Sequence, residues 1–258
     1  MNKIISKIGA VVVTITVFLF AICLIADLPF VSYLVCMFLP LGYIMMAVGF
    51  QYECCEERKV SASVGVVIAV IYAVMVLLVY YAQTTSVQLG GLNEQAVRIL
   101  DFQRGGLLFN YDLLGYGMMA LSTLFIGLSI NPSSKADKWL KYLMILHGVF
   151  FIGCFIMPMT GVFTDMASGG TIALLGWCAY FIPIGVLAYR HFQRNLNLDM
   201  KDVVGYCKNL ILSKDCSTFR QGKNWYCQIG NTRITVNSNS YTIITAHIVK
   251  QKQICRII

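Results

Sequence analysis

Residues 60–82 read VSASVGVVIAVIYAVMVLLVYYA and contain no charged side chain. An α-helix that crosses a bilayer needs about 20 consecutive, mostly apolar residues, and this stretch is long enough. Five further stretches meet the same requirement, at residues 8–26, 31–50, 107–130, 139–158 and 169–190. We therefore predict an α-helical integral membrane bundle of six transmembrane helices.

The composition of the chain excludes several other classes of protein. Of its 258 residues, 58% are hydrophobic and 12% are charged, and the mean hydropathy is +0.70. Soluble globular proteins are about 25% charged and about 45–50% apolar. The composition therefore excludes a soluble enzyme, a disordered chain and a secreted disulfide scaffold.

The distribution of charge predicts two domains. Residues 1–190 hold ten Lys or Arg and nine Asp or Glu, whereas residues 191–258 hold ten further cations and three acids, a net charge of +7. Since one architecture would not divide in this way, we predict a transmembrane domain at 1–194 and a small basic domain at 195–258.

Basic residues in short loops predict the orientation of the bundle, because cytoplasmic loops carry an excess of Lys and Arg. The N-terminal segment and the second and fourth predicted loops are basic, whereas the first and fifth contain no Lys or Arg. We expect both termini on the cytoplasmic side of the cell's inner membrane. The first span follows Lys3 and Lys7, but it is too long for a signal-peptide core, so we expect it to be retained.

The ten cysteines fit this orientation, because none falls in a loop predicted to lie outside, where disulfides form. No CxxC pair occurs, so we expect neither a metal site nor another cofactor.

The most specific polar stretch is DFQRGGLLFNYD at residues 101–112, which leads into the fourth span. It places Arg104, Asn110 and Asp112 at the predicted outer end of that span. Ionisable groups at membrane depth are costly and usually face a cavity or a partner. These residues predict either an outward-facing pocket for an ion or small ligand, or an interfacial cluster that orients the helix.

His147 lies near the middle of the fifth span. An unperturbed imidazole titrates near neutral pH, so His147 could relay protons or bind a ligand. It could equally hydrogen-bond a neighbouring helix. Because no second His or carboxylate stands at helical spacing, we favour the structural interpretation.

Small residues recur at every fourth position of the third span, at Ser61, Gly65, Ala69 and Ala73. Such a stripe allows another helix to approach closely, so it predicts a packing face.

The spans contain no HExxH, P-loop, GxSxG or paired-carboxylate motif, which disfavours a membrane protease and an ATP-driven pump. We therefore expect a non-enzymatic sensor, scaffold or accessory protein. The alternative is a small-solute permease that uses the Asp112 region, although the six spans show no evident three-plus-three repeat.

The sequence pattern changes after residue 195. Asp199 is a candidate cap for a helix in which Val203, Cys207 and Leu210 recur at three- and four-residue spacing. Beyond Ser213 the period is two, and turn signals separate strands predicted at 217–220, 225–229, 233–236 and 241–249. We predict a small α+β domain of one helix and three or four antiparallel strands.

Two parts of the chain resemble known families. Residues from about 10 to 194 resemble uncharacterised six-helix bacterial membrane proteins, chiefly through DFQRGGLLFNYDLLGY at 101–116. RQGKNWYCQI at 220–229 and ITVNSNSYTIITAHIVK at 234–250 resemble a small soluble bacterial domain family of unknown function, over residues from about 194 to 250. The two resemblances imply a fusion-like chain, and neither implies a catalytic residue.

Five side chains of the basic domain are candidates for a binding surface: Arg220, Lys223, Arg233, Tyr241 and His247. By analogy with small helix-and-sheet RNases, they would supply phosphate contacts, base stacking and acid–base chemistry toward RNA. Alternatively, the cations lie against anionic lipid of the inner leaflet. About 60 residues form a marginal core, so the domain could also lean on the bundle or form a homo-oligomer.

Overall fold

The computed structural model describes residues 2–102, 105–161, 169–201, 203–213, 215–230 and 232–248. The chain separates into two compact units, Met1–Asn195 and Leu196–Ile258, and each has a hydrophobic core of its own.

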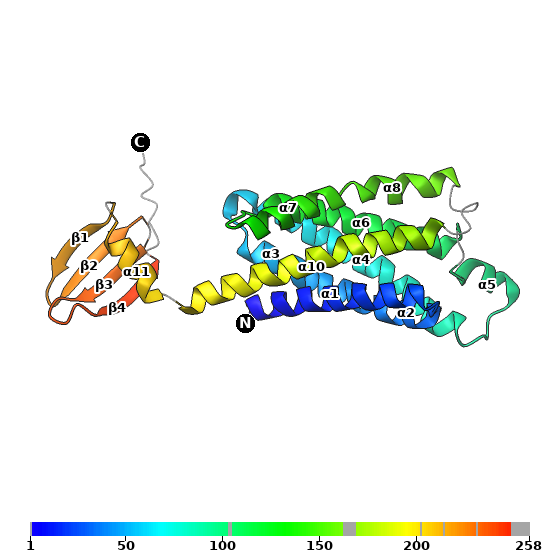
Figure 1. Cartoon of the computed structure of the whole chain (residues 1–258), viewed down its shortest axis with the longest axis horizontal. Coiled ribbons are helices and arrows are strands. Elements are labelled where there is room, and N and C mark those ends of the chain that lie inside the picture. Colours follow the sequence, from blue (N-terminus) through cyan, green and yellow to red (C-terminus); the bar gives the residue numbers. More distant parts are fainter. Residues whose placement is uncertain are drawn as a thin grey trace, which may run out of the picture. The chain divides into compact units, whose positions relative to one another are not determined.

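The first unit is a bundle in which long helices run beside one another (Figure 1). Its helices are α1 (Asn2–Ile25), α2 (Pro29–Cys36), α3 (Phe38–Glu53), α4 (Lys59–Ala82), α6 (Leu107–Ser129), α7 (Lys135–His147), α8 (Phe150–Ile156) and α10 (Gly169–Lys201). Shorter elements are η1 (Glu56–Arg58), η2 (Gln83–Val87), α5 (Glu94–Leu100) and η3 (Met157–Thr160).

Among the described residues, six stretches of helix are long and apolar enough to cross a membrane, which confirms the predicted fold class. They are Asn2–Ile25, Pro29–Glu53, Glu56–Val87, Leu107–Ser129, Lys135–Thr160 and Gly170–Arg194. Helix α7 begins before its apolar stretch because a polar side chain caps it. The Ser134 side chain accepts a hydrogen bond from the Asp137 amide at 3.2 Å, which begins the helix before its first apolar residue.

The small-residue stripe of α4 packs against α6. A Cβ at Gly65 would lie only 3.2 Å from the Ser122 carbonyl oxygen. Two hydrogen bonds connect the helices at this contact. Ser122 Oγ donates to the Gly65 carbonyl at 2.6 Å, and Ser61 Oγ donates to the Phe125 carbonyl at 2.7 Å. The backbones of α1 and α3 also approach closely, since a Cβ at Gly9 would lie 2.7 Å from the Gly42 carbonyl oxygen.

The second unit consists of α11 (Val203–Ile211) and a four-stranded antiparallel sheet, which confirms the predicted helix and meander (Figure 1). The strands are β1 (Ser217–Gln221), β2 (Asn224–Ile229), β3 (Thr232–Asn237) and β4 (Ile243–Ile248), in the order β1-β2-β3-β4. Cys207 of α11 is buried with Cys227, Ile234 and Val236, so α11 covers one face of the sheet.

The start predicted for the helix of the small basic domain was wrong. Helix α10 continues to Lys201, so Asp199 lies within α10, and α11 begins at Val203. The physical reason is that residues 191–201 contain neither Gly nor Pro, the residues that most readily end a helix.

Candidate functional site

Asp112, predicted at the outer end of the fourth span, is more deeply buried than Asn110. It lies in the second turn of α6 and is 8% exposed, and its Oδ2 accepts a hydrogen bond from Tyr80 OH at 3.3 Å. Nearby, Asn110 Nδ2 donates to the Gly105 carbonyl at 3.3 Å. Arg104, the third predicted member, falls outside the described residues.

Tyrosine rings surround this carboxyl group. Tyr80 OH is also 3.3 Å from Tyr116 OH, and the Tyr116 ring packs against Tyr72 with 5.7 Å between ring centroids. Within the described part of the chain, Oδ1 of Asp112 and Oδ1 of Asn110 are buried without a hydrogen-bond partner. An ionisable group buried at membrane depth is a candidate for a proton or small-cation site.

His147 is hydrogen-bonded to helices on both sides. Trp177 Nε1, which can only donate, lies 3.0 Å from His147 Nε2, so that nitrogen is the acceptor. The ring proton is therefore on Nδ1, which donates to Thr123 Oγ1 at 2.7 Å, and Thr123 in turn donates to the Ala120 carbonyl at 2.7 Å. His147 is thus held by α6 and α10, and these bonds do not connect it with Asp112.

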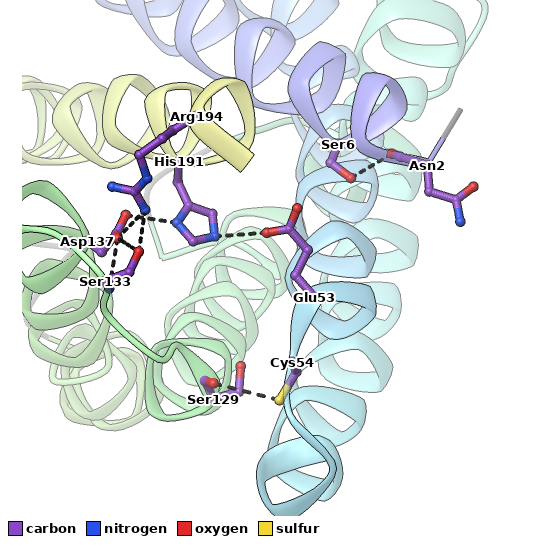
Figure 2. Close-up of polar contacts among 9 residues, drawn as sticks. All are labelled: Asn2, Ser6, Glu53, Cys54, Ser129, Ser133, Asp137, His191 and Arg194. Carbon is purple, nitrogen blue, oxygen red and sulfur yellow. Dashed lines mark hydrogen bonds and ion pairs between the residues drawn. The ribbon is translucent and has the colours of Figure 1, made fainter. Parts of the chain in front are cut away.

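A network of charged side chains at the other end of the bundle was not anticipated from the sequence (Figure 2). His191 of α10 lies between two carboxylates. Its Nδ1 is 2.9 Å from Asp137 Oδ1, and its Nε2 is 3.0 Å from Glu53 Oε2. Arg194 pairs with the second oxygen of Asp137 and donates to Ser133 Oγ at 2.8 Å. The network therefore joins α3, α7 and α10.

The hydrogen bonds of His191 define its charge. Carboxylate oxygens only accept hydrogen bonds, so both ring nitrogens must donate and the ring is an imidazolium. Two cations, His191 and Arg194, thereby balance two anions, Glu53 and Asp137. The side chains of His191, Asp137 and Glu53 are 9%, 1% and 13% exposed, so the charges are largely removed from water and depend on one another. Across the described residues, no group of three His, Cys, Asp or Glu side chains is arranged to hold a metal ion.

The same end of the bundle is tied together by the C-terminus of α6. The Ile130 carbonyl accepts hydrogen bonds from Arg58 Nη1 at 2.9 Å and from Lys141 Nζ at 3.1 Å. Cys54 Sγ donates to the Ser129 carbonyl at 3.7 Å (Figure 2), and burial raises the pKa of this thiol. Cations at the negative end of a helix dipole are stabilising, so Arg58 of η1 and Lys141 of α7 are fixed to one helix end.

Sequence reasoning missed this network because its members are far apart in the chain. A usable signal existed nevertheless. Glu53, Asp137 and His191 each stand at the predicted inner end of an apolar span, where a polar side chain finds partners only on neighbouring helices.

The five candidate residues of the second unit do not share one surface. Arg233 pairs with His247 across β3 and β4, so both lie on the same face. Arg220 pairs with Trp225 and lies on the opposite face, the one that packs against α11. Lys223 and Tyr241 stand in two turns at one end of the sheet, where the Ser238 amide donates to the Lys223 carbonyl at 3.0 Å.

A comparison with known families gives a match in the C-terminal part of the chain. Residues 185–247 match a family described as a protein of unknown function, DUF3781. The match supports the resemblance noted for this part, and it begins within the sixth span, so that it includes His191 and Arg194. No curated protein and no solved structure matches the chain, and the resemblance noted for residues 10–194 is not shown by these comparisons.

Proposed function

We propose that the protein is a non-enzymatic sensor, scaffold or accessory subunit whose six-span bundle holds a small interaction domain at the cytoplasmic surface of the inner membrane. The observation that carries this proposal is the network around His191, which ties α10 to α3 and α7 at the end of the sixth span. Because of these contacts, the part of α10 at the end of that span is fixed to its neighbours. A helix held in this way is suited to carrying a further domain.

The charges at this end of the bundle support the proposed orientation. Arg58 and Lys141 bond to the same carbonyl group, and Lys59 follows Arg58 directly. Basic residues close to the ends of spans favour the cytoplasmic side. The end that carries the His191 network is therefore assigned to the inside, together with the domain that follows α10.

Cysteine labelling tests this assignment. Asn239 is exposed in the turn between β3 and β4, so Asn239→Cys adds a reactive thiol to the second unit in a background whose native cysteines are replaced by Ser. A membrane-impermeant maleimide should label this position in inside-out vesicles and not in intact cells. Gln88→Cys, in the exposed turn directly after the third span, is the matched control and should label from the outside. Labelling of Asn239→Cys in intact cells would contradict the proposed location.

A second candidate function, a small-solute permease, is favoured by the incompletely bonded Asp112 carboxyl. Replacement of Asp112 by Asn preserves the shape of the side chain and removes its charge. If the bundle transports a cationic or proton-coupled solute, Asp112→Asn should abolish uptake, measured with a pH-sensitive dye in proteoliposomes exposed to amines, amino acids and sugars. If wild-type protein gives no flux with these solutes and neither Asp112→Asn nor His147→Ala changes a cellular phenotype, the permease is contradicted.

A further inference from the structure

One face of the sheet in the second unit carries a set of side chains that the candidate surface did not include. The strand register places Phe219 opposite Tyr226, and Arg233 between Gln228 and His247. Helix α11 packs on the other face, which carries Trp225, Cys227 and Val236. We call the face formed by Phe219, Tyr226, Gln228, Arg233 and His247 the open face.

Two aromatic rings lie side by side on the open face. The rings of Phe219 and Tyr226 stack with 5.3 Å between centroids and an interplanar angle of 15°. Phe219 nevertheless remains 43% exposed, although it is a large apolar side chain on an edge strand. Tyr226 is partly buried. Nearly parallel, solvent-accessible rings on a sheet are the platform on which unpaired bases stack.

Arg233 is positioned beside this platform. Its guanidinium carbon lies 6.0 Å from the centroid of the Phe219 ring. Gln228 Oε1 accepts hydrogen bonds from Arg233 Nε at 3.3 Å and from Nη2 at 3.0 Å, which fixes the plane of the guanidinium. Gln228 does not bond to Nη1 of Arg233, and this nitrogen can donate to a phosphate or to a base edge.

We propose that the open face binds single-stranded nucleic acid, with bases stacked on Phe219 and Tyr226 and a phosphate bonded by Arg233. This inference rests on the proposed function, in which the domain is an interaction module inside the cell. The charge of the domain is complementary, since its described residues from Val203 onward include Lys208, Arg220, Lys223 and Arg233 against one acid, Asp215.

The placement of these cations favours nucleic acid over a lipid surface. Lipid recognition uses several Lys or Arg side chains gathered on one side. Here Arg220 lies on the face opposite to Arg233, and Lys223 stands in a turn at the end of the sheet. The open face instead combines two rings, one fixed guanidinium, an amide and an imidazole, which are the groups that stack on bases and bond to them.

The test uses the full chain in nanodiscs of uncharged phosphatidylcholine. Binding of fluorescent oligouridylate and oligothymidylate of about 12 nucleotides is measured by anisotropy, since single-strand sites of this type cover about 4–16 nucleotides. Phe219→Leu should weaken binding about tenfold, because it keeps the apolar bulk and removes the ring, and Phe219→Tyr should preserve binding. The two probes distinguish RNA from DNA, because only oligouridylate carries the 2′-hydroxyl.

Arg233→Ala and Arg220→Ala form a matched pair, because each removes one positive charge on opposite faces. We expect Arg233→Ala to weaken binding several-fold and Arg220→Ala to weaken it by less than about twofold. Resistance of the buried Cys227 to alkylation checks that each variant retains its fold.

Absence of binding, equal losses from the two arginine variants, or an unchanged affinity in Phe219→Leu would overturn the proposal. Attachment to anionic phosphatidylglycerol vesicles without oligonucleotide binding would do so as well, and would assign the domain to the lipid surface. Because labelling at position 239 reports the location of the domain independently, a failed binding experiment leaves the proposed function standing.

Discussion

Nδ1 of His191 and Oδ1 of Asp137 lie 2.9 Å apart and join the end of the sixth span to the first turn of the fifth. Both side chains of this contact are buried and carry opposite charges. Glu53 and Arg194 complete the balance of charge around them. The strength of the contact therefore depends on the whole network.

Asp137→Asn should destabilise the bundle by about 3 kcal/mol, because removal of one partner leaves buried cations without compensation. The free energy of unfolding in detergent micelles measures this effect. Glu56→Gln is the control. Its partner Lys59 lies 2.6 Å away, but the side chains are 84% and 50% exposed, so the stability should not change measurably. Equal effects of the two substitutions would contradict a buried network.

Trp177→Phe should destabilise the bundle by about 1–3 kcal/mol, because it leaves His147 Nε2 as a buried acceptor without its donor. The same unfolding measurement checks this prediction. Trp139→Phe provides a comparison at a site that is 65% exposed, where no such loss is expected. If the free energy of unfolding is unchanged in Trp177→Phe, His147 does not depend on this bond.

Gly9→Ala should weaken the packing of α1 on α3 by about 1–3 kcal/mol, because its Cβ would lie 2.7 Å from the backbone oxygen of Gly42. The backbone cannot move aside as a flexible side chain can. Gly176→Ala, on α10, meets nothing within 4 Å and should be neutral or stabilising. Thermal denaturation of both variants in one detergent distinguishes the contact from a general effect of alanine.

Alkylation of Cys54 should be slow at neutral pH. Its rate should continue to increase above a pH of about 8.5, the ordinary pKa of a thiol. The reason is that burial raises the pKa of Cys54 and so reduces its thiolate fraction at a given pH. Mass spectrometry of peptides from brief iodoacetamide pulses measures the profile, with Cys54→Ser identifying the contribution of the exposed neighbour Cys55. A plateau of the Cys54 rate below pH 8 would contradict the prediction.

The spans were predictable because each depends on local composition alone. The stretch at residues 60–82 has no charge, and a helix of that length can cross a bilayer. The strands were predictable for a similar reason, since Gly222 and Gly230 mark tight turns between stretches of period two, and both adopt positive φ.

The site was not predictable to the same extent, because it depends on which helices are neighbours. Glu53 and His191 meet across 138 positions of sequence, and no local pattern encodes that meeting. The two faces of the sheet could be predicted from the sequence. A two-residue turn fixes the register of β1 and β2, and this register sets Arg220 apart from Phe219.

The order β1-β2-β3-β4 has a consequence for biosynthesis. Each strand pairs with its neighbour along the chain, so every pairing closes a short loop and loses little entropy. Contacts of this local kind form rapidly once the residues have left the ribosome. The sheet thus requires no long-range partner to assemble, whereas the bundle requires insertion of six spans before Glu53 can meet His191. We therefore expect that closure of the sheet does not limit maturation of this chain.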